Sequence, residues 1–322
     1  MRFGALPYKT KQFFIVLIKL SIVVGAFYFI YQKITLNSDL SYHTFINYLE
    51  QHDVFSIKHM AFLVFLSSLN WFFDILKWQT LTNPIKQISI KNATQQTLGA
   101  LTASLFTPNR IGEYGAKVLY FEPPLRKRVV LINFLGNITQ MGVTTILGCI
   151  GLTLFFFNYD IDFSLKKVLR FLTIVILISF MIGFGLKKYP FKIKGQSFSK
   201  IKAFFKDYPK NNIYKASTFS LLRYAVFSFQ FYWILLIFGV DISYPNAMIV
   251  ISSMYLLASI IPSISIFDVV IKGSVAVYLF TSVGVNDFII LSTVMLMWLL
   301  NFALPSVFGS YYVLNFKLPE SD

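Results

Sequence analysis

Residues Thr107–Phe121 read TPNRIGEYGAKVLYF, and this segment decides how the chain folds. It places an arginine, a glutamate and a lysine within eight residues, shortly after a helix-breaking proline. The chain around it is 56% apolar and only 13% charged. Charged side chains are costly inside a membrane and usually functional there. The segment therefore predicts both a break in a membrane helix and a binding site.

The composition predicts an all-α polytopic membrane protein. Several apolar runs in the 322-residue chain reach the roughly 20 residues that a helix needs to cross a bilayer. We expect a single integral-membrane domain over residues 1–322, with about six full transmembrane helices. The expected spans are Phe13–Tyr31, His59–Leu81, Val129–Phe157, Val168–Leu186, Ala216–Phe238 and Phe288–Leu314.

The net charge of +15 raises the question of nucleic-acid binding. The basic residues lie in loops between the spans, where the positive-inside rule and anionic lipid headgroups explain them. Nucleic acid is therefore not an expected partner. The same rule places both termini and the lysine-rich segment Lys187–Lys215 on the cytoplasmic side of the cell membrane. Within that segment, Ser197–Tyr208 has an apolar face among lysines and predicts an amphipathic helix on the membrane surface.

Two further apolar regions, Ala93–Phe121 and Ala247–Phe280, are each interrupted near the middle by a proline, Pro108 or Pro262. Each region is too short for two full spans and too broken for one. We expect each to form two half-helices in a re-entrant hairpin, which a protein bundle or a watery cavity shields from lipid. This assignment also keeps lysine and arginine on the cytoplasmic side.

The two broken regions also align with each other. LTASLFTPNRIGEYGAK (Leu101–Lys117) matches LLASIIPSISIFDVVIK (Leu256–Lys272), with one-residue slips around the proline. The aligned residues are Ser104 with Ser259, Pro108 with Pro262, Glu113 with Asp268, and Lys117 with Lys272. One span separates the two units, so the second enters the membrane from the opposite side, which predicts an inverted repeat. Its units cover about residues 58–157 and 216–314, with spans 13–31 and 168–186 outside them.

The segment after Thr107 has the features of a helix start. Thr107 can cap the helix, Pro108 suits its first position, and Arg110 falls in its first turn. A half-helix that starts inside a membrane directs N–H groups and a positive dipole end toward a cavity, where phosphate is a natural ligand. Arg110, Tyr114 and Lys117 then lie on one stripe of the helix.

Each broken region carries an acid four residues before a lysine, Glu113 before Lys117 and Asp268 before Lys272. This spacing favours ion pairs that partly offset the cost of intramembrane charge. One interpretation is that these pairs only fix the hairpins and bind no ligand. Arg110 argues against it, because its charge leaves a net positive site for an anion.

Two other charged groups lie within spans. Arg223 and Gln230 are seven residues apart on one face of their span, and they either line the same cavity or hold helices together. Asp74 and Lys77 lie near the cytoplasmic end of their span, and we interpret them as interface anchors that snorkel to the surface. The candidate lipid- and phosphate-binding residues are Thr107, Pro108, Arg110, Gly112, Glu113, Tyr114, Lys117, Arg223, Gln230, Pro262, Asp268 and Lys272.

Catalytic and cofactor motifs are mostly absent from the sequence. His43, His52 and His59 lie in or beside one expected external loop, without the spacing of metal ligands. The acid-x-acid motif at Asp160–Asp162 lies in a short loop expected on the outside, so we give it little weight. There is no Walker loop and no dinucleotide fingerprint. We expect no cofactor, no metal and no catalytic residue.

The first broken region has a recognisable motif. A proline followed by Arg-x-Gly-Glu at the start of a half-helix resembles the hallmark of the integral-membrane region of lysylphosphatidylglycerol synthases. Pro108, Arg110, Gly112 and Glu113 carry this resemblance.

The second broken region is similar to the family's later proline and acidic residue through Pro262 and Asp268. It departs from the family because SISIF replaces the glycines and aspartate replaces the usual glutamate. This departure bears on how freely that half moves and on which lipid it accepts.

The resemblance implies that the chain moves phospholipids or similar lipids between leaflets. In the full synthases this region flips the aminoacylated lipid, while a separate soluble domain makes it. Only eight residues follow Leu314, so we expect a lipid translocator without synthase activity. Besides the lipid and the membrane, a separate lipid-modifying enzyme and a second copy of the chain are candidate partners.

Three hypotheses for the function remain, in this order. The first is flippase-like movement of an anionic or aminoacylated phospholipid, or a related lipid-linked substrate, through a midplane cavity. The second is a membrane-embedded transferase acting on a polyprenyl-phosphate-linked substrate, with Glu113 and Asp268 as its acids. The third is a scaffold that recruits partners through the loop Lys187–Lys215.

Overall fold

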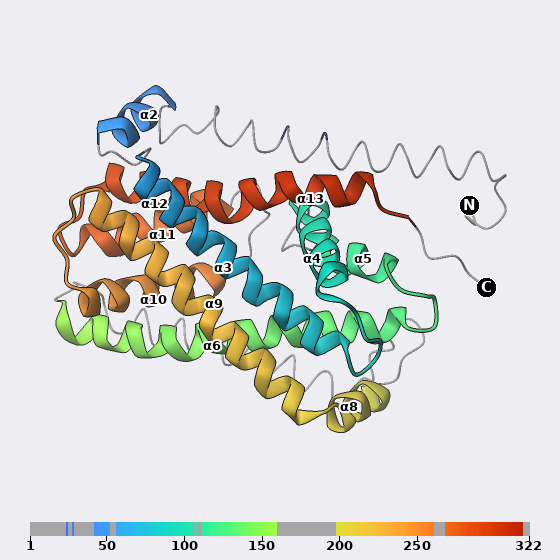
Figure 1. Ribbon diagram of the computed structural model, residues 1–322. Coiled ribbons are helices and arrows are strands. Elements are labelled where there is room, and N and C mark those ends of the chain that lie inside the picture. Colours follow the sequence, from blue (N-terminus) through green and yellow to red (C-terminus); the bar gives the residue numbers. More distant parts are fainter. Residues whose placement is uncertain are drawn as a thin grey trace.

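The computed structural model describes residues 24, 28, 42–51, 56–105, 107, 111–159, 198–260 and 268–317. Every regular element in these ranges is a helix (Figure 1). Four segments are long and apolar enough to cross a membrane. They are α3 (Ile57–Thr82), α6 (Arg126–Asn158), α9 (Lys210–Ile237) and the continuous run Asp287–Leu314. They confirm an all-α polytopic membrane protein.

These four segments coincide with four of the expected spans. The expected spans Phe13–Tyr31, apart from Val24 and Tyr28, and Val168–Leu186 lie outside the described residues. A short helix, α2 (Tyr42–Gln51), precedes α3.

Each region expected to hold a broken helix consists of two shorter helices. The first region contains α4 (Ile90–Ser104) and α5 (Ile111–Leu119), and the second contains α10 (Tyr244–Ile260) and α11 (Asp268–Thr281). The two helices of each pair contact each other. An ion pair of 2.7 Å between Lys86 Nζ and Glu122 Oε1 joins the loop before α4 to the loop after α5. Both ends of the first pair therefore lie on the same side of the bundle, whereas its re-entrant depth in a membrane and the inverted repeat stay predictions.

The run Asp287–Leu314 is helical throughout but changes its winding in the middle. It consists of α12 (Asp287–Trp298), a π-helical turn η3 (Leu299–Ala303) and α13 (Leu304–Leu314). Pro305 lacks the N–H that would otherwise bond the carbonyl of Asn301. That carbonyl instead accepts a 3.0 Å hydrogen bond from the indole Nε1 of Trp71 on α3. The irregular turn is thereby tied to α3, and π-turns of this kind are frequent at functional sites.

Glycines set two of the closest helix contacts. A Cβ added to Gly151 on α6 would lie 2.0 Å from Ser252 Oγ on α10. A Cβ added to Gly309 on α13 would lie 2.2 Å from the carbonyl oxygen of Leu98 on α4. Small residues of this kind let membrane helices approach closely without a hydrophobic driving force between them.

Helix α8 (Phe198–Asp207), which the sequence predicts to be amphipathic, lies next to the start of α9 (Figure 1). Phe204 and Phe205 pack against the apolar cluster at the end of α3. The Tyr208 hydroxyl donates to the carbonyl of Leu81, and burial raises the pKa of this phenol, so it remains a donor. These contacts hold α8 against the last turn of α3, while its position on a membrane surface stays a prediction.

Candidate functional site

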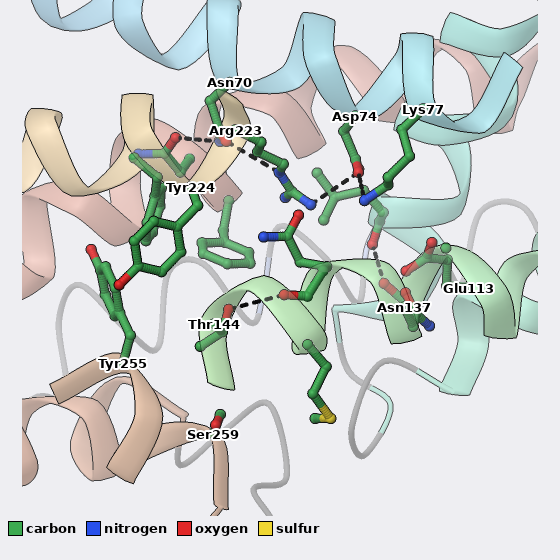
Figure 2. Close-up of a pocket in the computed structure, with 18 of the residues that line it drawn as sticks. Asn70, Asp74, Lys77, Glu113, Asn137, Thr144, Arg223, Tyr224, Tyr255 and Ser259 are labelled. Atoms are coloured by element: carbon green, nitrogen blue, oxygen red, sulfur yellow. Dashed lines mark hydrogen bonds and ion pairs between the residues drawn. The ribbon is translucent and has the colours of Figure 1, made fainter. Parts of the chain in front are cut away.

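The described helices line a cavity of about 680 Å³ (Figure 2). Side chains from both broken pairs, from α3, α6 and α9, and from η3 contribute to its wall. Arg223 lies near the middle of the 28-residue helix α9, and Asn301 lies near the middle of the 28-residue run Asp287–Leu314. If these helices span a bilayer, the cavity lies near its midplane.

Three charged side chains form a buried cluster on one wall, which we call the Asp74 triad (Figure 2). Asp74 Oδ1 accepts Lys77 Nζ at 2.7 Å and Arg223 Nη1 at 2.9 Å. Asp74 is 7% exposed and Lys77 is 6% exposed. The interpretation of Asp74 and Lys77 as snorkelling anchors was therefore wrong, because both side chains are buried and line the internal cavity. Two cations share one carboxylate, so the triad carries a net positive charge.

A chain of side-chain amides holds Arg223 in place. Its Nε donates to Asn70 Oδ1 at 3.1 Å, and Asn70 Nδ2 donates to Asn301 Oδ1 at 2.9 Å. Asn301 Nδ2 donates to Gln230 Oε1 at 2.8 Å, and Gln230 Nε2 donates to Ser67 Oγ at 2.8 Å. Gln230 is 0% exposed and lies behind the cavity wall. It joins helices, whereas Arg223 lines the cavity.

A second charged group lies on the wall formed by α5. Lys117 Nζ donates to Glu113 Oε1 at 2.7 Å and to Asn133 Oδ1 at 2.9 Å. It also lies 4.1 Å from the centre of the Trp78 ring, in a cation–π contact. The indole Nε1 of Trp78 in turn donates to Gln96 Oε1 at 2.7 Å. The ion pair expected from the four-residue spacing of Glu113 and Lys117 is present and buried.

Both broken pairs bring aligned residues to the cavity. Ser104 and Lys117 of the first pair and Ser259 and Lys272 of the second all line it. Lys272 Nζ lies 5.3 Å from the centre of the Phe302 ring. These are the same residues that the internal alignment matched, although their arrangement as a repeat stays a prediction.

Thr107 contacts the first turn of the described helix α5 (Ile111–Leu119). Its Oγ1 accepts the backbone N–H of Gly112 at 2.9 Å. A Cβ added to Gly112 would lie 2.6 Å from the carbonyl oxygen of Ala103, so the close approach needs glycine. Tyr114 accepts a 2.8 Å hydrogen bond from Asn137 Nδ2 on α6.

Three of the candidate site residues cannot be placed. Pro108, Arg110 and Pro262 lie outside the described residues. Asp268 begins α11, but its side chain is not among those described.

The sequence interpretation did not single out several residues of the wall. Asn70, Asn133, Gln140, Tyr255 and Asn301 all line the cavity. All five are polar side chains within apolar helices, so a search for polar residues inside the apolar segments would have found them. Among the described residues, no group of three His, Cys, Asp or Glu side chains could hold a metal ion.

Residues 16–309 match the protein family described as Lysylphosphatidylglycerol synthase TM region. This match covers well over half of the chain and confirms the resemblance carried by Gly112 and Glu113 and their neighbours. Comparison with curated proteins gives no match. Membership indicates a lipid-related role in the membrane. The chain therefore belongs to the lysylphosphatidylglycerol synthase transmembrane-region family.

Proposed function

We propose that this protein moves a phospholipid, or a related lipid with a phosphate in its headgroup, between the two leaflets of the cell membrane. The headgroup crosses through the cavity while the acyl tails stay in the bilayer. The observation that carries this proposal is the buried Asp74 triad, whose surplus positive charge faces the cavity in the middle of the helices. The family match supports the lipid-related part of the proposal.

Arg223 is well suited to bind a phosphate oxygen. Its Nε and Nη1 are held by Asn70 and Asp74, while its Nη2 makes no hydrogen bond with the described residues. A guanidinium fixed on one side presents its remaining donors in a defined direction, and hydrogen bonds between a cation and phosphate are strong. The side chain is 17% exposed, which leaves it accessible from the cavity.

The charges at the ends of the bundle support an orientation with both termini in the cytoplasm. Figure 1 shows the end of α3, the starts of α6 and α9, and the end of α13 on the same side. That side carries Lys86, Arg126, Lys127 and Arg128, whereas Asp241 and Asp287 lie on the other side. Under the positive-inside rule the basic side faces the cytoplasm.

The test is reconstitution of the purified protein into vesicles that contain tail-labelled lipids. Addition of a membrane-impermeant quencher then reports how fast each lipid reaches the outer leaflet. We expect Arg223→Leu to slow translocation about 10- to 100-fold, because a hydrogen bond to a charged group contributes about 1.5–3 kcal/mol. Arg223→Lys should retain part of the rate.

The matched control is Arg128→Leu, which removes an arginine from an exposed position in the first turn of α6. We expect it to translocate lipid at the wild-type rate. If a correctly folded Arg223→Leu variant translocates as fast as this control, the proposal is wrong. Arg110→Ala and Asp268→Asn test the two broken pairs in the same way, and each should lose translocation. A covalently altered lipid in the mass spectrum would instead favour the transferase hypothesis.

A further inference from the structure

We propose that the cavity selects a headgroup that is anionic and bears hydroxyl groups, and that it disfavours a headgroup carrying an ammonium group. Phosphatidylglycerol and sugar-phosphate lipids belong to the favoured class. This inference rests on the proposed function, because it names the headgroup chemistry of the same site.

The first observation is that both carboxylates of the described wall already bind cations of the protein. Asp74 holds Lys77 and Arg223, and Glu113 holds Lys117. An ammonium group in a low-dielectric cavity needs an anionic partner, and it would have to displace one of these cations. The positive charge of the triad repels it in addition.

The second observation is that two aromatic rings of the wall are also covered by cations of the protein. Lys117 Nζ lies 4.1 Å from the centre of the Trp78 ring, and Lys272 Nζ lies 5.3 Å from that of Phe302. Aromatic faces are the usual alternative to carboxylates for holding an ammonium ligand. These two rings serve protein cations instead.

The third observation is a set of buried polar atoms that have no hydrogen-bond partner among the described residues. They are Asn133 Nδ2, Gln140 Oε1 and the hydroxyls of Tyr224 and Tyr255, and all four residues line the cavity. Buried polar groups in proteins are nearly always bonded, so these atoms indicate a ligand that completes them. The set combines a donor, an acceptor and two hydroxyls. A hydroxyl group of a lipid both donates and accepts, so it can serve any of these atoms, whereas an ammonium group only donates and cannot serve the Asn133 amide.

Gln140 and Tyr255 belong to α6 and α10, Tyr224 belongs to α9, and Asn133 lies beside Lys117. In Figure 2, Tyr255 lies beside Tyr224 and away from Asp74 and Lys77. The wall therefore offers one place for a phosphate, at the triad, and another for a hydroxyl group, at the two tyrosines. A lipid with a phosphate alone would fill only the first.

The experiment compares four lipids with identical labelled tails in vesicles that contain the full chain. The lipids are phosphatidylglycerol, phosphatidic acid, phosphatidylcholine and lysyl-phosphatidylglycerol. We expect wild type to move phosphatidylglycerol fastest. Gln140→Leu and Tyr255→Phe should each lower the ratio of the phosphatidylglycerol rate to the phosphatidic acid rate about five-fold, the value of one ordinary hydrogen bond.

Ser292→Ala is the matched control for these variants. The Ser292 hydroxyl is likewise buried and has no partner among the residues that the structure describes, but it lies outside the cavity wall. We expect the lipid ratio of this variant to equal that of wild type. An equal drop in Ser292→Ala and Tyr255→Phe would overturn the assignment of the hydroxyl site. Tyr255→Phe keeps the ring and its packing, so it remains informative if Gln140→Leu does not fold.

The outcomes separate this inference from the proposed function. If lysyl-phosphatidylglycerol moves as fast as phosphatidylglycerol or faster, the headgroup assignment is wrong while lipid translocation stands. If folded wild type moves none of the four lipids, both are overturned.

Discussion

Asp74→Asn removes the one carboxylate that two buried cations share. Lys77 Nζ and Arg223 Nη1 lie 2.7 Å and 2.9 Å from Asp74 Oδ1, and at an effective dielectric constant of about 20 each contact contributes about 6 kcal/mol of attraction. Desolvation and repulsion between the two cations offset much of this, and breaking a buried ion pair usually costs about 3–5 kcal/mol. Asparagine keeps the shape of the side chain. We therefore expect the free energy of unfolding to fall by about 3–5 kcal/mol.

A double-mutant cycle with Lys77→Met isolates the part that comes from charge. Lys77→Met alone leaves the pair of Asp74 and Arg223 intact, so we expect only a small loss of stability. Added to Asp74→Asn, it removes one of two uncompensated cations and should restore about 1–3 kcal/mol. The assay is unfolding in a titration with sodium dodecyl sulfate, followed by tryptophan fluorescence. Trp71 reports directly on the site, because Arg223 Cζ lies 5.5 Å from the centre of its ring.

The reasoning is refuted by two results together. One is an Asp74→Asn variant whose stability lies within about 0.5 kcal/mol of wild type, as for an ordinary surface substitution. The other is additivity between Asp74→Asn and Lys77→Met. The three side chains would then not form one buried cluster, and the surplus charge would no longer support a phosphate site.

Two further variants test the packing around the site. Gly151→Val sets a side chain against Ser252 Oγ, which lies 2.0 Å from the added Cβ. We therefore expect the free energy of unfolding to fall by about 1–3 kcal/mol from overpacking. The control in the same titration is Gly142→Val on the same helix, where an added Cβ meets no atom within 4 Å. Asn301→Leu leaves the buried Gln230 Oε1 without its 2.8 Å donor, so we expect the thermal midpoint in detergent to fall by an amount equivalent to about 1–3 kcal/mol. A midpoint unchanged from wild type would show that the amide chain does not stabilise the bundle.

The long helices could be predicted from the sequence because lipid imposes a single requirement on them. A span must be apolar over its whole crossing and must bond its own backbone. The boundaries were less accurate for the same reason. The span expected at Ala216–Phe238 is helix α9, which already begins at Lys210. Hydropathy detects the part of a helix that suits lipid, and α9 extends beyond that part through the polar residues KNNIYK.

The candidate site was predictable only where its contacts are local. Glu113 and Lys117 are four residues apart on one helix, so their spacing alone predicted the ion pair. The contact between Asp74 and Arg223 joins residues 149 positions apart. Taken alone, Asp74 and Lys77 look like a neutral pair near a helix end, and nothing in the spacing reveals that a third charge from α9 makes the group cationic. Pairing between helices depends on packing, which the hydrophobic pattern does not specify.

The amide chain explains how such a group can persist within an apolar bundle. An unpaired buried polar group is costly, and a partly satisfied network costs more than an apolar core. Asn70 accepts a hydrogen bond from Arg223 and donates one to Asn301. The hydrogen bond from Trp71 to the π-turn holds the helices of Asn70 and Asn301 together. The side chains of this network thus bond to one another, but the net positive charge of the Asp74 triad is not neutralised. The described residues leave the excess positive charge of the triad unbalanced, and an anion entering the cavity neutralises it without disturbing any of these bonds.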